Sequence, residues 1–327
     1  MPEQNIQAIP LKEYPTIHLP RRISVIEAVN LKTKIQQLLQ TSYPLEKVVL
    51  DCSQTTFIDS SGIGALVSAH KISREKEVRL IHRGVTPQMM AVLKMTALDR
   101  VLTIESLTTQ TKPVTAPEPL PETHPSVRSW VKRLIDLVGA TIGLGITAIA
   151  FIPIAAAIKF ESHGPIFFGQ IRQGWMGKEF KIWKFRSMYT DAEERKKQLV
   201  AENQADGKTF KMKNDPRVTK VGRFLRKTSL DELPQFWNVL KGEMSLVGTR
   251  PPTPNEVDIY EVPEWQRLDV KPGMTGEWQV SGRSTISKFE DIIALDLRYQ
   301  RNWSLTHDIK LIIKTILVVF SKNSGAN

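Results

Sequence analysis

Strand-like and helix-like hydrophobic patterns alternate over the first hundred residues. Apolar side chains recur at helical spacing along Val25–Leu39, which predicts an amphipathic helix. Val48–Leu50 is a short, uninterrupted apolar run, typical of a buried strand. The other expected elements are extended segments at Ala8–Leu11, Thr16–Leu19, Val78–Ile81 and Val101–Ile104, and helices at Gly64–Ile72 and Thr86–Lys94. This pattern predicts a small α/β domain in which helices pack on a sheet.

A proline-rich segment separates this region from the rest of the chain. Residues 111–126 contain five prolines, and proline removes a backbone donor and fixes its own φ. The composition predicts an extended, semi-rigid linker. We therefore expect residues 1–110 and 127–327 to form separate domains.

One long apolar run follows the linker. Leu137–Ile158 contains 22 residues and no charge, and a helix of that length reaches about 33 Å, enough to cross the hydrocarbon core of a bilayer. Pro153 lies inside the run and interrupts the helical hydrogen-bond ladder. Basic side chains flank both ends, and the positive-inside rule places such flanks in the cytoplasm. We therefore predict a re-entrant helix over residues 137–158, which enters and leaves by the same face.

The remainder has the pattern of a mainly α domain with some β structure (α+β). Phe180–Met188 is expected to be a strand and Asp191–Leu199 a charged helix. Leu305–Phe320 is a strongly apolar terminal helix that Lys310 and Lys314 interrupt. Because of these lysines, we expect this helix to pack on the core and not to cross a membrane.

Length and composition support two globular domains. The chain has 327 residues, of which 41% are hydrophobic and 24% charged, which excludes a disordered chain and a polytopic membrane protein. With Cys52 alone, neither an internal disulfide nor a Cys-rich zinc site is possible. The first thirty residues are polar and contain prolines, so we expect no secretory signal.

The net charge of +11 is concentrated in one part of the sequence. Residues 171–230 carry 16 basic and 7 acidic side chains, a net of +9. Nucleic acid, an anionic membrane surface or a phosphorylated substrate would each suit this block, and so would a solvated basic surface. The six histidines have no ligand spacing, and the chain contains neither a P-loop nor a dinucleotide-binding fingerprint.

The segment Arg226–Gln235 contains the strongest candidate for chemistry. Ser229 and Glu232 have the spacing of a capping box, which begins a helix and needs no chemistry. The same geometry places Asp231 in the first turn, where backbone N–H groups and the helix dipole favour anions. An ionised Asp is a competent nucleophile toward phosphorus once nearby cations neutralise the target.

Three other fragments present cations in short motifs. Lys184 and Arg186 alternate along an extended segment, Arg250 lies in a Gly-Thr-Arg-Pro-Pro turn, and Lys271 begins a Gly/Pro loop. Arginine suits bidentate contact with phosphate. Each fragment by itself is also typical of a solvated turn.

In order along the chain, the motifs resemble the bacterial sugar transferase family, the monotopic polyprenyl-phosphate phosphoglycosyl transferases. The resemblance covers about Ser126 to the C-terminus. The motifs that carry it are Lys132-Arg133-x-x-Asp136, Lys184-Phe185-Arg186-Ser187-Met188, Thr228-Ser229-Leu230-Asp231-Glu232-Leu233-Pro234-Gln235, Gly248-Thr249-Arg250-Pro251 and Lys271-Pro272-Gly273-Met274-Thr275-Gly276.

The resemblance implies a reaction and its cofactor. Members move a sugar-1-phosphate from a UDP-sugar to a polyprenyl (undecaprenyl) phosphate at the cytoplasmic membrane face, use Mg²⁺, and initiate the synthesis of extracellular polysaccharides or other glycoconjugates. The resemblance makes Asp231 the nucleophile of a two-step reaction that releases UMP and passes through an Asp-linked phosphosugar. It also implies that Asp231 and Glu232 hold the Mg²⁺.

The resemblance further implies roles for cations and for the membrane helix. The implied phosphate- and nucleotide-binding side chains are Lys184, Arg186, Arg226, Arg250 and Lys271. The residues implied to set the bend and depth of the membrane helix are Lys132, Arg133, Asp136 and Pro153. The sequence departs from the family at Thr249, where many relatives carry proline.

The N-terminal region has a motif of its own. Asp59-Ser60-Ser61-Gly62 follows a strand and precedes a helix, and a serine N-cap explains it without further function. With the surrounding elements, residues 5–108 resemble the STAS domain of anti-sigma factor antagonists. That resemblance makes Ser60 the candidate phosphorylation site and implies a protein partner or kinase, while a docking module without phosphorylation is the alternative. A phosphate at a helix N-terminus would be electrostatically favourable.

Two functions follow from these patterns. The first is a monotopic phosphoglycosyl transferase at the cytoplasmic face of the bacterial inner membrane, regulated by its STAS domain. Its partners would be a UDP-sugar, polyprenyl phosphate and membrane lipid, with no nucleic acid. The alternative is a membrane-tethered STAS docking module with an inactive transferase portion. The intact Asp231–Glu232 dyad and its accompanying cations favour the enzyme.

Overall fold

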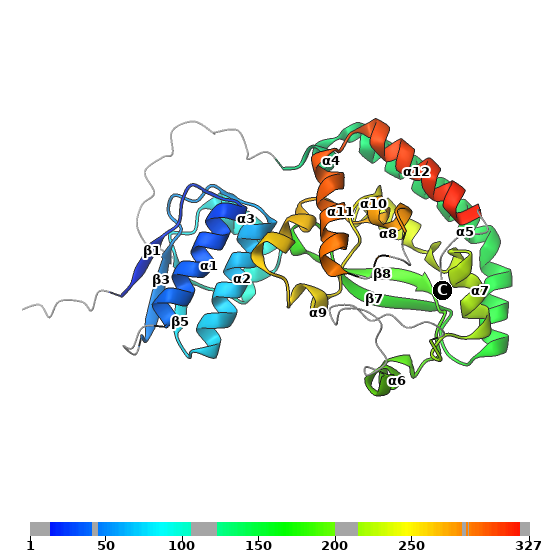
Figure 1. The fold of residues 1–327 in the computed structure, drawn as a ribbon, viewed down its shortest axis with the longest axis horizontal. Coiled ribbons are helices and arrows are strands. Elements are labelled where there is room, and N and C mark those ends of the chain that lie inside the picture. Colours follow the sequence, from blue (N-terminus) through cyan, green and yellow to red (C-terminus); the bar gives the residue numbers. More distant parts are fainter. Residues whose placement is uncertain are drawn as a thin grey trace, which may run out of the picture. The chain divides into compact units, whose positions relative to one another are not determined.

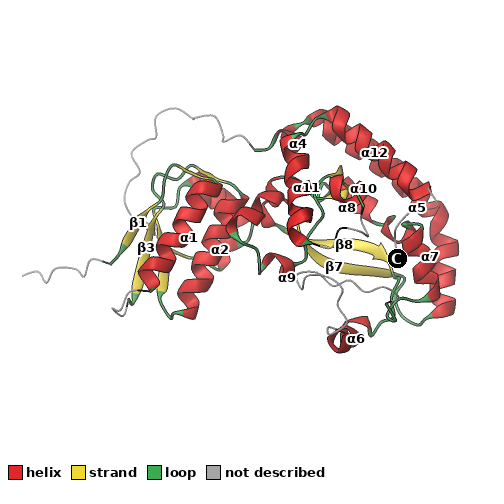
Figure 2. Cartoon of the chain, in the orientation of Figure 1, coloured by secondary structure: helices red, strands yellow, loops and turns green. Residues whose placement is uncertain are grey.

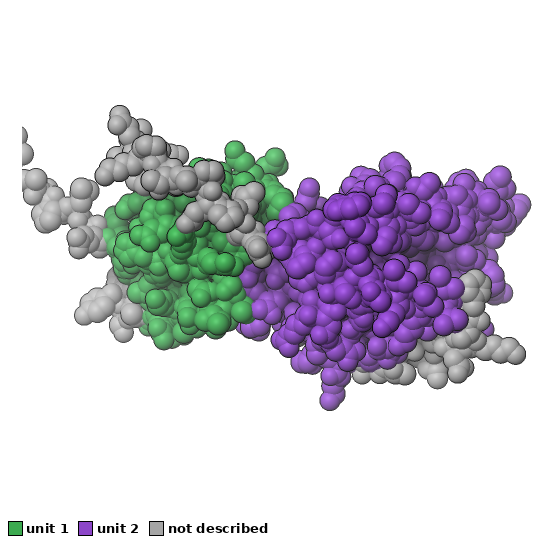
Figure 3. Space-filling view, turned by 90° about the horizontal axis from the view of Figure 1, so that it is seen from above, with its two compact units in different colours: residues 1–58, 64–120 green, residues 59–63, 121–327 purple. Residues whose placement is uncertain are grey.

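A computed structural model describes residues 14–40, 45–105, 123–199, 215–282, 286 and 288–320. Contacts divide the chain into two units, one of residues 1–58 and 64–120 and the other of residues 59–63 and 121–327 (Figure 3). Both units mix helices and strands (Figure 2), which confirms the predicted fold class. The expected extended segment Ala8–Leu11 lies outside the described residues.

The first unit is built on a parallel four-stranded sheet in the order β1-β3-β5-β6, beside a separate parallel pair of β2 and β4. The central strand β3 is buried because Val48, Val49 and Leu50 face packed helices and neighbouring strands. The elements of this unit are β1 (Thr16–His18), β2 (Arg22–Ile23), α1 (Val25–Leu39), β3 (Lys47–Asp51), β4 (Phe57–Ile58), α2 (Ser60–Glu75), β5 (Arg79–Arg83), α3 (Pro87–Met95), the 3₁₀ turn η1 (Leu98–Arg100) and β6 (Thr103–Glu105).

The helices of this unit begin where their capping residues place them. Helix α1 has the predicted bounds, and a capping box joins Ser24 and Glu27 at its start. Helix α2 begins at Ser60, four residues before the predicted start. Asp59 takes the capping role, since its Oδ1 accepts a hydrogen bond from the Gly62 N–H at 2.9 Å. The interpretation of Ser60 as the N-cap was therefore wrong.

The second unit combines several helices with two short sheets (Figure 1). Strands β7 and β8 form an antiparallel hairpin, and β9 pairs in parallel with β10. Its helices and strands are α4 (Pro125–Arg128), α5 (Trp130–Glu161), β7 (Phe167–Gln173), β8 (Glu179–Phe185), α6 (Ala192–Leu199), α7 (Lys220–Lys227), α8 (Gln235–Lys241), β9 (Ser245–Val247), α9 (Pro254–Val257), β10 (Gly273–Thr275), α10 (Glu277–Val280), α11 (Phe289–Arg301) and α12 (Leu305–Phe320). Its 3₁₀ segments are η2 (Trp175–Gly177), η4 (Leu230–Glu232) and η5 (Val262–Asp269).

Two predicted boundaries differ from the structure. The last two residues of the expected linker, Pro125 and Ser126, belong to α4, because proline is well tolerated in the first turn of a helix. Residues 106–122 of the linker region lie outside the described part. The strand predicted at Phe180–Met188 runs from Glu179 to Phe185. The Arg186 N–H still bonds to the Ile166 carbonyl in the hairpin register, whereas the next carbonyl, that of Ser187, accepts from the Thr219 N–H.

Helix α5 contains the predicted apolar run and extends beyond both of its ends. Among the described residues it is the one helix whose length and composition suffice to cross a membrane. One face packs on α8 and β9, where Gly139 and Gly143 allow Leu246 and Phe236 to approach the helix closely. The opposite face exposes a stripe of large apolar side chains, namely Trp130, Leu134, Val138, Ile142, Ile146, Ile149 and Ile152.

Three hydrophobic clusters hold the second unit together. One joins Ala140 of α5 to the β8 strand and to α8. A second joins the later half of α5, at Ile154 and Ile158, to Phe185 and Leu225. The third packs Leu311 of α12 beside β9. Helix α12 therefore has the predicted bounds and packs one face on the core, as expected.

Candidate active site

The two candidate carboxylates lie on a short turn between two helices. Helix α7 ends at Lys227, and the 3₁₀ turn η4 then carries Asp231 and Glu232. Ser229, just before the turn, has a left-handed φ of 56°, a conformation that non-glycine residues adopt at a cost. This turn of the backbone leaves the Asp231 side chain buried and Glu232 half-buried.

The expected capping box does not form at this turn. Ser229 makes no side-chain cap hydrogen bond, because its left-handed backbone differs from the extended conformation that a capping residue needs. The Glu232 carboxylate instead accepts a hydrogen bond from Lys184 Nζ at 3.0 Å. Lys184 comes from β8, so the hairpin supplies a cation directly to the dyad.

Arg226 and Arg186 lie near the same region but have different partners. Arg226 Nε donates to Ser187 Oγ at 3.0 Å. Arg186 turns the other way and donates to the carbonyls of His163 and Ser162, both at 2.7 Å. These carbonyls follow the end of α5, so Arg186 fixes the chain where the helix leads into the β7–β8 hairpin.

Arg250 forms a two-pronged ion pair with Glu256. Its two terminal nitrogens lie 2.9 and 3.0 Å from the two carboxylate oxygens, and its guanidinium lies over the Trp278 ring. Burial would raise the pKa of Glu256, but Arg250 outweighs that effect and the pKa is lowered. The pair holds the Gly-Thr-Arg-Pro turn as a fixed cationic loop.

Sequence reasoning missed Arg172, which lies on β7. Its side chain donates to the Pro251 carbonyl at 3.1 Å and to Gln170. Burial and the Arg250 charge lower its pKa to about 10, and Glu232 is among the anions that oppose this shift. The one sequence feature that could have identified Arg172 was its place in the mixed apolar and polar segment Phe167–Gln173. The pattern of that segment did not predict a strand.

The cations at the start of α5 anchor that helix to its neighbours. Arg133 donates to the carbonyls of Val239 and Leu240 at 2.8 and 2.7 Å, which satisfies the end of α8. Lys271 lies beside Arg133, and burial followed by the Arg133 charge lowers its pKa. The structure thus places Lys271 at the base of α5, beside Arg133 and the end of α8.

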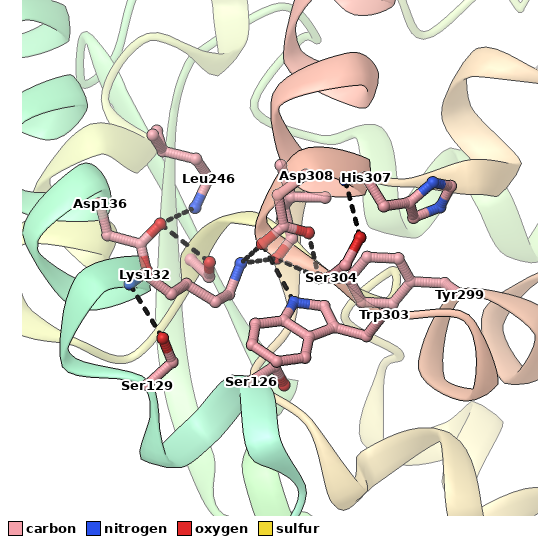
Figure 4. Close-up of polar contacts among 12 residues, drawn as sticks. Ser126, Ser129, Lys132, Asp136, Leu246, Tyr299, Trp303, Ser304, His307 and Asp308 are labelled. Atoms are coloured by element: carbon pink, nitrogen blue, oxygen red, sulfur yellow. Dashed lines mark hydrogen bonds and ion pairs between the residues drawn. The ribbon is translucent and has the colours of Figure 1, made fainter.

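A buried polar cluster fixes the first turns of α5 (Figure 4). Lys132 Nζ donates to Asp308 of α12 at 2.6 Å and to the Val247 carbonyl at 3.0 Å. Asp136 accepts from Ser245 Oγ and from the Leu246 N–H, both at 2.9 Å. These bonds satisfy charges that would be costly to bury alone, and they set the position of the helix relative to β9.

Further along, α5 contacts the dyad turn itself. Thr147 Oγ1 lies 3.3 Å from the Leu233 carbonyl, one residue after Glu232, while it also bonds back to Gly143. Pro153 lies inside the helix and is exposed. The apolar helix therefore positions the carboxylate turn, which links a candidate membrane element to the candidate chemistry.

The donor set suits a divalent cation that has few protein ligands. Asp231 and Glu232 are adjacent on one turn, and no group of three or more His, Cys, Asp or Glu side chains is found in the described part of the chain. Mg²⁺ usually takes one or two carboxylates together with substrate phosphates and water. Two carboxylates fit that requirement.

Comparisons with known proteins agree with these motifs. Residues 127–322 match the bacterial sugar transferase model, and residues 8–110 match the STAS domain model. The chain is 52% identical over 188 residues to the galactosyl transferase CpsE of Streptococcus agalactiae serotype III (strain NEM316), which covers 58% of this chain and 42% of that protein.

Two other relatives extend the comparison. The exopolysaccharide production protein ExoY of Rhizobium meliloti (strain 1021) is 39% identical over 216 residues, which covers 64% of this chain and 95% of ExoY. The UDP-glucose:undecaprenyl-phosphate glucose-1-phosphate transferase of Escherichia coli (strain K12) is 44% identical over 201 residues, which covers 59% of this chain and 41% of that protein. The chain thus spans less than half the length of CpsE and of the E. coli transferase. Because the sugar transferase model matches more than half of the chain, including the Asp231–Glu232 turn, the chain belongs to the bacterial sugar transferase family and carries an N-terminal STAS domain.

Proposed function

We propose that the chain transfers a sugar-1-phosphate from a UDP-sugar to a polyprenyl (undecaprenyl) phosphate at the cytoplasmic face of the membrane, as a first step in polysaccharide synthesis. The observation that carries the proposal is the Asp231–Glu232 turn, held between the Lys184 ion pair and α5. The activity for which the E. coli relative is named supports the donor and acceptor classes.

Asp231 is the proposed nucleophile. Its carboxylate oxygen forms a bond to the phosphorus that bears the sugar, and the bond from that phosphorus to UMP breaks, so UMP leaves with the electron pair. An oxygen of the lipid phosphate then attacks the same phosphorus. The Asp231–phosphorus bond breaks, which releases the lipid-linked diphosphate sugar and restores the carboxylate.

The other residues neutralise charge and hold geometry, which is what phosphoryl transfer chiefly requires. Lys184 pairs with Glu232, Arg172 interacts electrostatically with the same carboxylate, and Arg226 lies near the end of the helix that precedes the dyad. Asp231 and Glu232 would hold Mg²⁺, whose charge would stabilise the phosphate oxygens. Arg250 and its loop are the proposed nucleotide contact.

The polyprenyl acceptor requires an active site near the bilayer. We propose that α5 is re-entrant, since Pro153 interrupts its backbone ladder and basic residues flank both of its ends. The outer stripe of α5 would contact lipid while its inner face holds the dyad turn. The intact dyad with its lysine partner favours this enzyme over a docking module with an inactive transferase portion.

The proposal is tested by trapping the covalent adduct. The protein is incubated with Mg²⁺ and a radiolabelled UDP-sugar in the absence of acceptor, and intact-protein and peptide mass spectrometry locate any added phosphosugar. We expect the adduct on Asp231, release of UMP, and loss of both in Asp231→Asn. The matched control Asp258→Asn, at an exposed carboxylate, should retain both. An adduct on a different side chain, or full transfer by Asp231→Asn, excludes the proposed nucleophile.

A further inference from the structure

A fully buried ion pair is bonded to the turn that carries Arg250. Arg267 of η5 has no exposed surface and is the largest fully buried side chain in the described part of the chain, and Asp296 of α11 is only 1% exposed. One terminal nitrogen of Arg267 donates to the Asp296 carboxylate, and the other donates to the Tyr260 hydroxyl at 2.7 Å. Both charges are thus withdrawn from solvent and from any bound substrate.

The same pair holds the backbone of the turn. Arg267 Nη2, which donates to Asp296, also donates to the Arg250 carbonyl at 3.1 Å. The Arg250 backbone interacts with the Asp296 carboxylate as well. Thr249 Oγ1 donates to the Arg267 carbonyl at 3.0 Å, and the Thr249 carbonyl accepts from the Gly273 N–H at 2.8 Å. Residues 249 and 250 are therefore fixed by contacts with η5, α11 and β10.

The Arg250 side chain has its own partners within the loop. Glu256 of α9 accepts from both of its terminal nitrogens, and the guanidinium lies over the Trp278 ring. Because Glu256 lies only six residues further along the chain, this bond shapes the loop without fixing its place in the unit. The contacts with Arg267 and Asp296 are among those that fix its place, since they come from η5 and α11.

Stability alone does not account for a buried pair of this kind. Removing two opposite charges from water has a cost that their attraction often fails to repay, and apolar replacements of similar volume are often neutral or stabilising. Arg267 Nε has no hydrogen-bond partner among the residues that the structure describes, which adds to that cost. The bonds that the pair makes beyond itself converge on the Arg250 turn. A role in placing this turn therefore explains the arrangement.

We propose that Arg267 and Asp296 are positioning residues for the donor substrate, which hold Arg250 where it meets the nucleotide of the bound UDP-sugar. This inference rests on the proposed function, which makes Arg250 the nucleotide contact. It adds two residues that touch no substrate and act through Arg250. The nucleotide is bound before the reaction as well as during it. Loss of the pair should therefore weaken donor binding and leave the step at Asp231 unchanged once the donor is bound.

The test compares the affinity for UDP in the presence of Mg²⁺, measured by calorimetry on four forms of the full chain in detergent. They are the native chain, Arg267→Met with Asp296→Leu, Arg250→Met, and the three substitutions combined. Removing both charges of the pair avoids leaving one of them buried alone. We expect the pair variant and Arg250→Met each to weaken binding by about 10-fold or more. The combined variant should bind within about 2-fold of Arg250→Met, because the pair acts through that arginine.

Two further measurements separate positioning from a general loss of structure. UMP release by the pair variant at saturating donor should stay within about 3-fold of the native rate. Asp291→Asn, at an exposed carboxylate on α11, is the matched control and should bind UDP as the native chain does. If the pair variant does not fold, Thr249→Val takes its place in the same comparison, since it removes the hydroxyl that bonds the turn to Arg267.

Three outcomes overturn the positioning role. The first is native affinity for UDP in the pair variant. The second is a combined variant in which the two losses add, as independent structural damage would make them. The third is unchanged affinity in Arg250→Met, which would remove Arg250 from the nucleotide site. The adduct on Asp231 tests the transferase chemistry separately, so its failure is distinguishable from all three.

Discussion

Lys184 and Glu232 form a half-buried ion pair at the dyad turn, where the proposed function places a substrate phosphate. The lysine is 27% exposed and the glutamate 16% exposed, which leaves room for an incoming anion to compete for the ammonium group. A substrate phosphate that takes Lys184 would release Glu232 toward the metal. Because of this exchange, a substitution of Lys184 tests the proposed site more directly than a substitution of a more distant cation.

Replacement of Lys184 by methionine should lower kcat/KM for UMP release by about 100-fold or more, since one preorganised charge is lost next to the reacting phosphate. The matched control is Lys181→Met on the same strand, where the ammonium group is exposed over the Trp183 ring. Steady-state kinetics on both variants check this. An equal loss of kcat/KM in both variants would mean that any substitution on this strand lowers activity. The charge of Lys184 would then have no special role.

His82 of the STAS domain should make the stability of that domain depend on pH. Burial lowers its pKa to about 4, whereas the unfolded chain has the usual value near 6.5. Between these pH values the unfolded state binds a proton that the native state does not. Stability should therefore fall as the pH falls through this window, by up to about 3 kcal/mol.

Hydrogen exchange of β3 and β5 in the full chain, corrected for intrinsic exchange rates, measures this loss. The variant His82→Leu should remove most of it, while His70→Gln, at a half-exposed histidine, should keep it. The same slope in the His82→Leu variant would assign the pH dependence to other groups.

At the level of single residues, local spacing identifies candidate side chains but does not predict the partners that these side chains have in the fold. The motif around Asp231 and Glu232 is local, so its spacing was visible. The phosphate contacts of Arg186 and Arg250 stay predictions, and in the structure the first fixes the end of α5 and the second pairs with Glu256. Such partners depend on tertiary packing, which local patterns do not contain.

Among the elements, α5 depends on glycine at one particular position. A Cβ added at Gly143 would lie 2.4 Å from the Phe236 ring, so α5 and α8 would have to separate. We expect Gly143→Ala to destabilise the unit by about 1–3 kcal/mol. Gly145, two residues later, has nothing within 4 Å of the same position, and Gly145→Ala should be neutral or stabilising by up to about 1 kcal/mol.

The temperature of half-inactivation in detergent compares these two glycine variants directly. Gly143→Ala should lower it and reduce UMP release, because Thr147 on the same face contacts the carbonyl of Leu233. Equal behaviour of the two variants would show that close packing against α8 does not set the position of α5.

Elements with a sustained apolar period were predicted most accurately. Helices α1 and α12 have the expected bounds, because apolar residues recur at helical spacing over their whole length. Strand β7 was missed, since its residues are half-exposed or exposed on both faces and do not alternate. The turn η4 was missed because it depends on a left-handed serine, which no helix or strand propensity predicts.

At the scale of the whole molecule, the topology of α5 decides where the dyad turn and the STAS domain lie. Single-cysteine variants at Arg128 and Lys159, on the two flanks of α5, report it in intact cells. Burial raises the pKa of the native Cys52 thiol to about 12, so Cys52→Ser removes only a weakly reactive background. A re-entrant helix should protect both positions from an impermeant maleimide, and cell lysis should expose both.

Labelling of only one flank in intact cells would mean that α5 crosses the membrane. The dyad turn and the STAS domain would then lie on opposite sides of the membrane. A STAS domain that regulates from the cytoplasm would leave the dyad turn on the outer side, where no UDP-sugar reaches it. This outcome would contradict the proposed location, while the adduct on Asp231 would still test the chemistry separately.

The ion pair between Lys132 and Asp308 joins residues that are 176 positions apart. During translation at about 5–20 residues per second, Lys132 is made roughly 9–35 s before its partner. The nascent apolar helix therefore exists for that time without the contact that fixes its base. If α5 enters lipid during synthesis, as the proposed location requires, insertion comes first and anchoring second, and a chain released early would remain attached to the membrane without a completed catalytic unit.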